Sequence, residues 1–115
     1  MNGTKAFTPL GKTFVIPSDT VAPTGVQVST IDAYANQSAC AYRIVNSGAV
    51  VVHLGWGPSA AIATANAVAA TAGSPTNSLV IGPGATEIFT FGPNAYFSAL
   101  SASAVSVYIT VGEGI

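Results

Sequence analysis

Side chains able to perform acid–base or nucleophilic chemistry are few in this chain. It has one histidine, one cysteine and four carboxylic acids: His53, Cys40, Asp19, Asp32, Glu87 and Glu113. A cysteine and a histidine on neighbouring strands could form a thiolate–imidazole pair for nucleophilic catalysis. The sequence instead predicts that Cys40 shares an apolar strand face with Tyr42 and Ile44, where a thiol behaves as a small hydrophobe.

His53 also lacks a visible catalytic partner. It is expected to point away from the core face of its strand, as a surface or interface histidine does. One cysteine and one histidine cannot supply a thiolate zinc cluster. Glu87 and Arg43 are the single charges on their strands, so a structural ion pair is expected of them, within the chain or across an interface. We therefore expect no enzyme, no catalytic residue, no metal and no cofactor.

One aromatic side chain is a further candidate for ligand contact. Trp56 stands in Gly55-Trp56-Gly57-Pro58 at the end of a predicted strand. It could stack on a sugar ring, as could Tyr96 or Tyr108, but a tryptophan at a strand end more often plugs the end of a core. The sequence leaves both interpretations open.

Charge is scarce along the whole chain. Charged residues make up 6% of the 115 residues, against roughly 25% in ordinary soluble domains. Three Lys and Arg residues cannot neutralise a phosphate track, so nucleic acid is not expected as a partner. Residues 44–86 contain no Asp, Glu, Lys or Arg, but glycine, proline and asparagine interrupt them too often for a membrane-spanning helix. Residues 1–5 lead into no apolar run, so no signal peptide and no membrane partner are expected.

Short strands with alternating side chains account for most of the sequence. Residues 105–111 alternate branched apolar side chains with Ser, Tyr and Thr, as a strand with one face on a core does. Residues 40–45 and 49–54 flank Asn46-Ser47-Gly48 and are expected to form a hairpin. Further strands are expected at residues 13–16, 25–29, 78–81, 86–91 and 95–100. This spacing predicts a single all-β domain over residues 1–115, an antiparallel β-sandwich or jelly-roll-like barrel of short strands.

Two segments do not fit the strand pattern. Residues 58–76 are rich in alanine and carry no charge. They are expected to form a long loop with at most one helical turn, or else a low-charge arm that packs against a neighbouring subunit. Residues 1–12 have no periodicity and are expected to form a frayed tail or an N-terminal arm docked on a partner.

Five stretches between Cys40 and the C-terminus share a texture of short apolar runs closed by small and polar residues. They are Arg43-Ile44-Val45-Asn46, Val52-His53-Leu54-Gly55-Trp56-Gly57, Asn77-Ser78-Leu79-Val80-Ile81-Gly82-Pro83-Gly84-Ala85-Thr86-Glu87, Ala95-Tyr96-Phe97 and Ile109-Thr110-Val111-Gly112-Glu113-Gly114. Together they resemble the small β-sandwich virion proteins of tailed bacteriophages, and capsid decoration (cement) proteins most of all. The resemblance is one of texture and length, and no motif carries binding residues over to this chain.

This resemblance implies a jelly-roll-like subunit, dimeric or trimeric, made in the host cytoplasm and placed on the outside of a virion. There it would bridge adjacent major capsid proteins and brace the shell against the pressure of packaged DNA. Interface residues are expected in the loops and the N-terminal arm: Phe7, Leu10, Trp56, Pro58, Ile62 and Val68. The alternatives are a carbohydrate- or receptor-binding module of a phage fibre or adhesin, and a structural component of the tail or neck.

Overall fold

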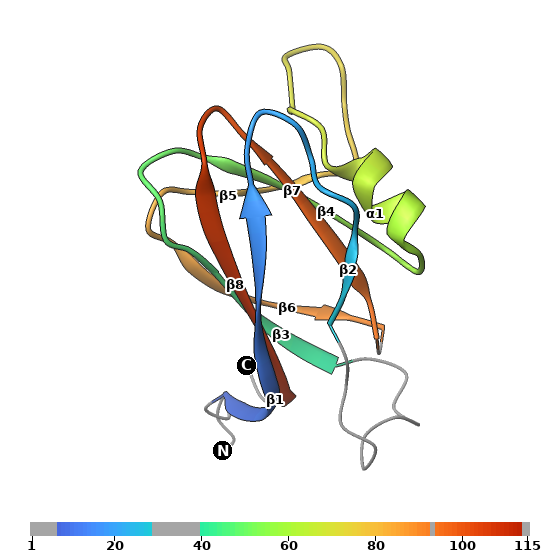
Figure 1. The fold of residues 1–115 in the computed structure, drawn as a ribbon, viewed down its shortest axis with the longest axis vertical. Coiled ribbons are helices and arrows are strands. Elements are labelled where there is room, and N and C mark those ends of the chain that lie inside the picture. The colour runs from blue at the N-terminus through green and yellow to red at the C-terminus, as the bar shows by residue number, and fades with distance from the viewer. Residues whose placement is uncertain (1–6, 29–39, 93, 114–115) are drawn as a thin grey trace.

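Eight strands and one short helix make up the described part of the chain in the computed structural model, which covers residues 7–28, 40–92 and 94–113. They are β1 (Thr8–Ser18), β2 (Val26–Gln27), β3 (Cys40–Asn46), β4 (Val52–Gly57), α1 (Ala60–Asn66), β5 (Leu79–Ile81), β6 (Thr86–Phe91), β7 (Tyr96–Ser101) and β8 (Val105–Glu113). Sheet A has the strand order β1-β8-β3-β6, and sheet B has the order β2-β7-β4-β5 (Figure 1). Both sheets are antiparallel, so the predicted all-β sandwich is confirmed.

The core forms between the two sheets, as the alternating pattern predicts. On β8, Val107 and Ile109 are fully buried, whereas Tyr108 between them is exposed. The buried side chains of both sheets form one cluster: Ile16, Val28, Tyr42, Ile44, Val52, Leu54, Ile81, Ala95, Phe97, Ala99, Val105, Val107, Ile109 and Val111. Each large apolar side chain buried in this way contributes about 1.5–3 kcal/mol, so alternation along the strands is also what stabilises the sandwich.

The first strand is longer than the sequence predicts. The prediction covered residues 13–16, but β1 also includes Pro9 and Pro17. Proline is tolerated here because β1 is the first strand of sheet A and pairs with β8 alone. Residues 8–12 of the predicted N-terminal arm thus belong to the sheet, and residues 1–6 lie outside the described part.

The predicted hairpin of residues 40–45 and 49–54 is wrong. β3 pairs with β6 and β8 in sheet A, whereas β4 pairs with β5 and β7 in sheet B. The short connection between them therefore crosses from one sheet to the other. Both segments are strands, but their partners come from distant parts of the sequence.

The side chain of Asn46 holds this crossing in place. It is fully buried, and the two N–H groups of its Nδ2 are shared among the carbonyl oxygens of Val50, Ile81 and Gly82 at N···O distances of 2.9, 3.1 and 3.0 Å. Its Oδ1 accepts the backbone N–H of Gly48 at 3.0 Å. One amide thus joins the end of β3 to the end of β5, and it gives hydrogen-bond partners to backbone carbonyls at the crossing.

The alanine-rich segment at residues 58–76 contains a helix of seven residues, where the sequence predicted a loop with at most one turn. Ser59 caps it, because the Oγ of Ser59 accepts the backbone N–H of Ile62 at 3.3 Å. In the described part of the chain, no helix is long and apolar enough to cross a membrane.

This helix packs on the outer side of sheet B in the same chain (Figure 1). Ala63 and Ala67 are buried there, and Gly55 of β4 offers them bare backbone. A Cβ at Gly55 would overlap the backbone of both alanines, so the close approach depends on glycine. The side chain of Ile62 lies over Gly57 and remains 44% exposed.

Candidate functional site

The outer face of sheet A presents its side chains in rows that cross all four strands. Strand pairing aligns Val15, Tyr108, Val45 and Thr86 in one such row, called here the Tyr108 row. Val15 is 49% exposed and Tyr108 is 38% exposed, although both carry large hydrophobic groups. Val15, Tyr108 and the partly buried Val45 are neighbours across three strands, so they offer one apolar strip that a partner could cover.

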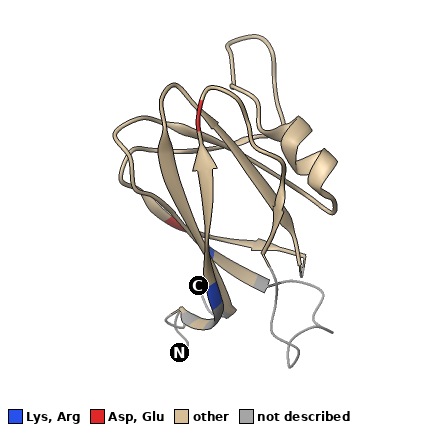
Figure 2. Cartoon of the chain, viewed as in Figure 1, with Lys and Arg blue, Asp and Glu red and all other residues tan. Residues whose placement is uncertain are grey.

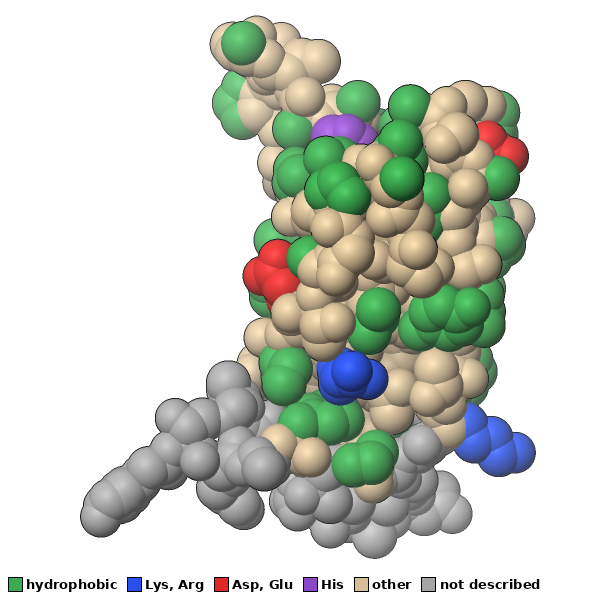
Figure 3. Space-filling view, turned by 90° about the vertical axis from the view of Figure 1, so that its left-hand side faces the viewer, with side chains coloured by type: hydrophobic (Ala, Val, Ile, Leu, Met, Phe, Trp, Pro, Cys, Tyr) green, Lys and Arg blue, Asp and Glu red, His purple; other side chains and the backbone are tan. Residues whose placement is uncertain are grey.

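Charged groups are sparse around the Tyr108 row. The next row contains Thr13, Thr110, Arg43 and Ile88, with a hydrogen bond of 2.7 Å between the two threonine hydroxyls. Arg43 is the one charged residue of these two rows. Charged side chains stand apart from one another along the described chain (Figure 2), and hydrophobic and uncharged polar groups cover most of the face seen in Figure 3.

Glu87 lies on the opposite face of sheet A from Arg43. In the β3–β6 pairing Arg43 stands opposite Ile88, whereas Glu87 stands opposite the buried Ile44. Because successive side chains of a strand point to opposite faces, Arg43 and Glu87 do not pair with each other. An ion pair across an interface stays a prediction. Glu87 is an exposed charge on the inward side of an edge strand, an arrangement that discourages pairing between sheet edges.

Replacing Glu87 with valine is expected to increase self-association. Among the described strands β6 has a neighbour on one side only, so its other edge offers unpaired backbone groups to a second chain. The E87V variant removes the charge that discourages a second chain from pairing with the edge of β6. It also adds a β-branched side chain, which favours pairing as a strand. Light scattering during heating should show aggregation beginning at a lower temperature than in the wild type. The T86V variant adds valine next to the charge and keeps it, so an equal onset in both variants would contradict this role.

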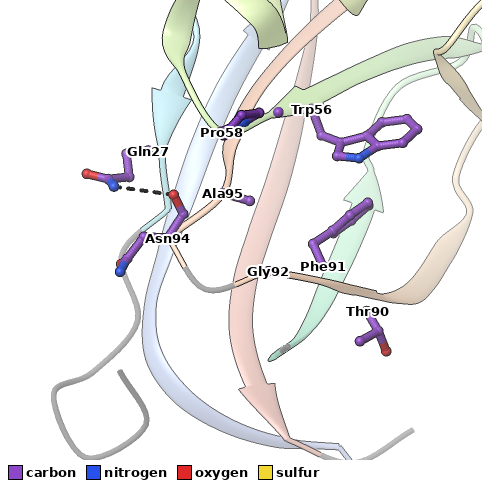
Figure 4. A pocket seen from close by; sticks show the side chains of 9 residues that line it. Gln27, Trp56, Pro58, Thr90, Phe91, Gly92, Asn94 and Ala95 are labelled. Atoms are coloured by element: carbon purple, nitrogen blue, oxygen red, sulfur yellow. Dashed lines mark hydrogen bonds between the residues drawn. The ribbon is translucent and has the colours of Figure 1, made fainter. Parts of the chain in front are cut away.

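A hollow of about 610 Å³ opens where β4 ends (Figure 4). It is called here the Trp56 groove and is lined by Gln27, Trp56, Gly57, Pro58, Thr90, Phe91, Gly92, Asn94 and Ala95. The side chains of Trp56 and Phe91 lie on the core side of the two sheets, whereas Gln27 lies on the outer side of β2, next to Asn94. Its volume falls within the range of about 300–1,000 Å³ that is typical of small-molecule sites.

The aromatic side of the groove is also the end of the core. Trp56 is half-buried, packs against the core, and lies with its ring centre 5.4 Å from that of Phe91. Phe91 in turn contacts Tyr42 and Phe97, with ring centres 5.6 and 5.4 Å away. The interpretation that Trp56 plugs the end of the core is therefore confirmed, and the same residue forms a wall of the groove.

The other side of the groove is a turn held by Tyr42. The hydroxyl of Tyr42 donates to the carbonyl oxygen of Gly92 at 2.8 Å and accepts the backbone N–H of Ala95 at 3.3 Å. Asn94 has a φ of 58°, a left-handed conformation that asparagine adopts more readily than most residues. The carbonyl oxygen of Asn94 accepts a hydrogen bond from Nε2 of Gln27 at 3.3 Å, which fixes the amide of Gln27 at the rim.

Three of the six predicted interface residues come together at this groove. Trp56 and Pro58 line it. Ile62 of α1 lies beside them, because its side chain covers Gly57, the residue between the two. These three side chains therefore surround one end of sheet B.

The other predicted interface residues lie elsewhere. Val68 follows α1 and is 39% exposed. Phe7 lines a separate hollow together with Thr13 and Arg43, on the outer face of sheet A. Leu10 belongs to β1, and its side chain lies outside the described part of the structure.

His53 and Cys40 lie in different sheets, so the hairpin that would have paired them does not exist. In sheet B, the Nδ1 of His53 accepts the backbone N–H of Ala70 at 3.3 Å, which holds the segment after α1 near the sheet. Cys40 begins β3 in sheet A, and its side chain is outside the described part. No group of three or more His, Cys, Asp and Glu residues in the described chain is placed to hold a metal ion.

The sequence predicted Trp56 and Pro58 as interface residues and named Tyr108 as a possible sugar contact, but it did not single out Val15, Gln27 or Asn94. Val15 and Tyr108 occupy outward positions of strands that the sequence predicts, so alternation already marked them. Gln27 and Asn94 carried no such signal, because their contact depends on the pairing of β2 with β7. Comparisons of the chain with protein-family models, curated proteins and solved structures find no match.

Proposed function

We propose that this protein is a structural virion protein that decorates a bacteriophage capsid and stabilises it by bridging major capsid subunits, without catalysis. The observation that carries the proposal is the outer face of sheet A. Val15 and Tyr108 are exposed there in one row, and Arg43 is the one charge in the two central rows. Such a face suits contact with protein, because interface cores are depleted of charged residues. The resemblance to decoration proteins supplies the identity of the partner.

The scarcity of charge over the whole chain supports the same proposal. A formal net charge of -1 and a charged fraction of 6% favour association over dispersal. We therefore expect a homo-oligomer, a dimer or a trimer, with the major capsid protein and other virion proteins as neighbours. A place in the tail or neck would use the same surface chemistry and is the nearest alternative.

The mechanism consists of binding energy alone. A protein that binds the expanded shell and not its dissociated subunits stabilises the shell by mass action. Many copies on one lattice multiply contacts that are individually modest. Because the outward residues of sheet A take little part in the core, this face can bind a partner without rearrangement of the fold.

Thermal melting of shells tests this function. Shells stripped of the protein should dissociate at a lower temperature than complete shells, and adding the purified protein back should restore the original melting temperature. Equal melting of stripped and complete shells would overturn the proposal. Solution mass measurement of the free protein accompanies this test, since a defined dimer or trimer is expected.

A further inference from the structure

We propose that a hollow around Arg43, on the outer face of sheet A, binds the carboxylate of an aspartate or glutamate side chain of the partner protein. The hollow has a volume of about 380 Å³, is called here the Arg43 hollow, and is lined by Phe7, Pro9, Thr13, Arg43 and Thr110. This inference rests on the proposed function, because it names the chemical group with which the capsid partner meets this face. Three features carry it: the place of Arg43 beside the Tyr108 row, two threonine hydroxyls and an apolar wall.

Arg43 lies next to the apolar strip that the partner covers. Strand pairing places Thr13, Thr110 and Arg43 in one row, and the Tyr108 row lies two residues further along the same strands. Side chains two residues apart on a strand point to the same face and are about 7 Å apart. A protein that covers Tyr108 therefore also removes water from the guanidinium of Arg43. A charge that loses its water costs free energy unless an opposite charge replaces that water, so a partner that binds stably brings an anion to Arg43.

The described part of this chain offers Arg43 no carboxylate of its own. Glu87 lies on the opposite face of sheet A. Asp19 follows the far end of β1, where it bridges to Leu100 of sheet B and its carboxylate accepts the backbone N–H of Thr20 at 2.8 Å. A second copy of this chain would bring the same two described acidic side chains. We therefore favour a different protein as the source of the carboxylate.

Two threonine hydroxyls add a hydrogen-bond donor beside the guanidinium. The Oγ1 atoms of Thr13 and Thr110 lie 2.7 Å apart, so one hydroxyl donates to the other. The pair carries two protons and this bond uses one, which leaves the second for a ligand oxygen in the hollow that both residues line. A carboxylate has two acceptor oxygens and no proton to donate, so it matches an arginine and a hydroxyl side by side.

The apolar wall favours a carboxylate on an amino-acid side chain over an inorganic anion. Phe7 is half-buried and Pro9 is exposed, and both line the hollow. The methylene groups of a glutamate or aspartate side chain can pack on this wall while the carboxylate reaches Arg43. Phosphate and sulfate have no apolar part to pack there. Their additional negative charge would also lack a cation, since Arg43 is the one charged residue among the described residues that line the hollow.

Binding of the full-length R43Q variant to stripped shells tests the proposal. Arg43 is exposed in the free protein, so R43Q should unfold at the same urea concentration as the wild type. We expect R43Q to bind shells at least about tenfold more weakly, as for the loss of a hydrogen bond between charged groups. The R43K variant keeps the charge but loses the planar fork, so its affinity should lie between the two. The matched control K12Q removes an exposed positive charge of β1 that does not line the hollow, and it should bind as the wild type does.

Shells whose carboxylates have been converted to amides identify the group on the partner. Treatment with a carbodiimide and glycinamide removes these charges, and the wild type should then bind no more tightly than R43Q. Four results would overturn the inference and leave the capsid function standing: R43Q binds untreated shells as tightly as the wild type, K12Q is weakened as much as R43Q, the wild type keeps its advantage over R43Q on amidated shells, or R43Q changes the mass of the free protein in solution, which would place the carboxylate on a second copy. Failure of the wild type itself to bind untreated shells would overturn the capsid function and this inference together.

Discussion

Replacing Gly55 with alanine is expected to lower the free energy of unfolding by about 3 kcal/mol, at the upper end of the usual cost of overpacking. The Cβ of the new side chain would overlap the carbonyl oxygen of Ala63 and the backbone nitrogen of Ala67. It would also lie 2.7 Å from the carbonyl carbon of Asn66. These are backbone atoms and cannot rotate away, so α1 would have to move off sheet B.

Urea denaturation of the G55A variant measures this effect. The control is G82A, whose Cβ would meet nothing closer than the Cβ of Ala85 at 3.9 Å, an ordinary contact. We expect G82A to unfold close to the wild-type midpoint and G55A to unfold at a much lower urea concentration. Equal midpoints for the two variants would show that α1 does not rest on the backbone of β4.

Replacing Asn46 with aspartate is expected to lower the free energy of unfolding by about 4 kcal/mol, because a buried charge loses its solvation and keeps only the backbone N–H of Gly48 as a donor. The two side chains have nearly the same shape. In N46D, however, an oxygen replaces the Nδ2 that donates to the carbonyl oxygens of Val50, Ile81 and Gly82. Three favourable contacts at 2.9–3.1 Å thereby become repulsive.

The pH dependence of the stability of N46D shows whether the buried carboxylate charge causes the loss of stability. Burial and the facing carbonyl oxygens raise the pKa of the new carboxyl in the folded state above its unfolded value of about 3.9. Below that unfolded pKa the carboxyl is protonated in both states and the charge penalty is absent. The penalty grows as pH rises toward the folded-state pKa, so N46D should lose stability with rising pH relative to the wild type. The N77D variant, at an exposed position, should show no such loss, and a pH-independent difference for N46D would contradict this account.

The strands of this fold could be read from the sequence, because each needs only a local pattern. Alternation over residues 105–111 predicted the inward side chains of β8, and branched residues between glycine and proline marked the other strands. Pairing could not be read in the same way. Asn46-Ser47-Gly48 looks like a hairpin turn, and only the bonds from Asn46 to distant Ile81 and Gly82 show that it crosses between sheets.

The helix escaped prediction for a related reason. Residues 60–66 have no ion pairs and few strong helix formers besides alanine, so local propensity favoured a loop. Their helical state depends on the Ser59 cap and on the bare backbone at Gly55, which lies on another element. Of the candidate site, the sequence indicated Trp56 as a solitary aromatic beside Pro58, whereas the groove that Trp56 lines with Phe91 required the complete fold.

The low number of charged residues matters most on the outer face of sheet A. The Tyr108 row has no charged residue there, and Arg43 is the one charged residue of the row that contains Thr13 and Thr110. A partner protein can cover such a face at little desolvation cost. The capsid proposal therefore depends on the Tyr108 row more than on the loops around Trp56.

Binding of variants to stripped shells tests this central claim most directly. The double variant V15E/Y108E places two charges in the Tyr108 row and should keep its fold, since both side chains are exposed. The control V21E adds a charge at a loop position that is 79% exposed. We predict that V21E binds shells and restores their melting temperature as the wild type does, and that V15E/Y108E binds at least about tenfold more weakly. Full binding and protection by a folded V15E/Y108E would contradict the account.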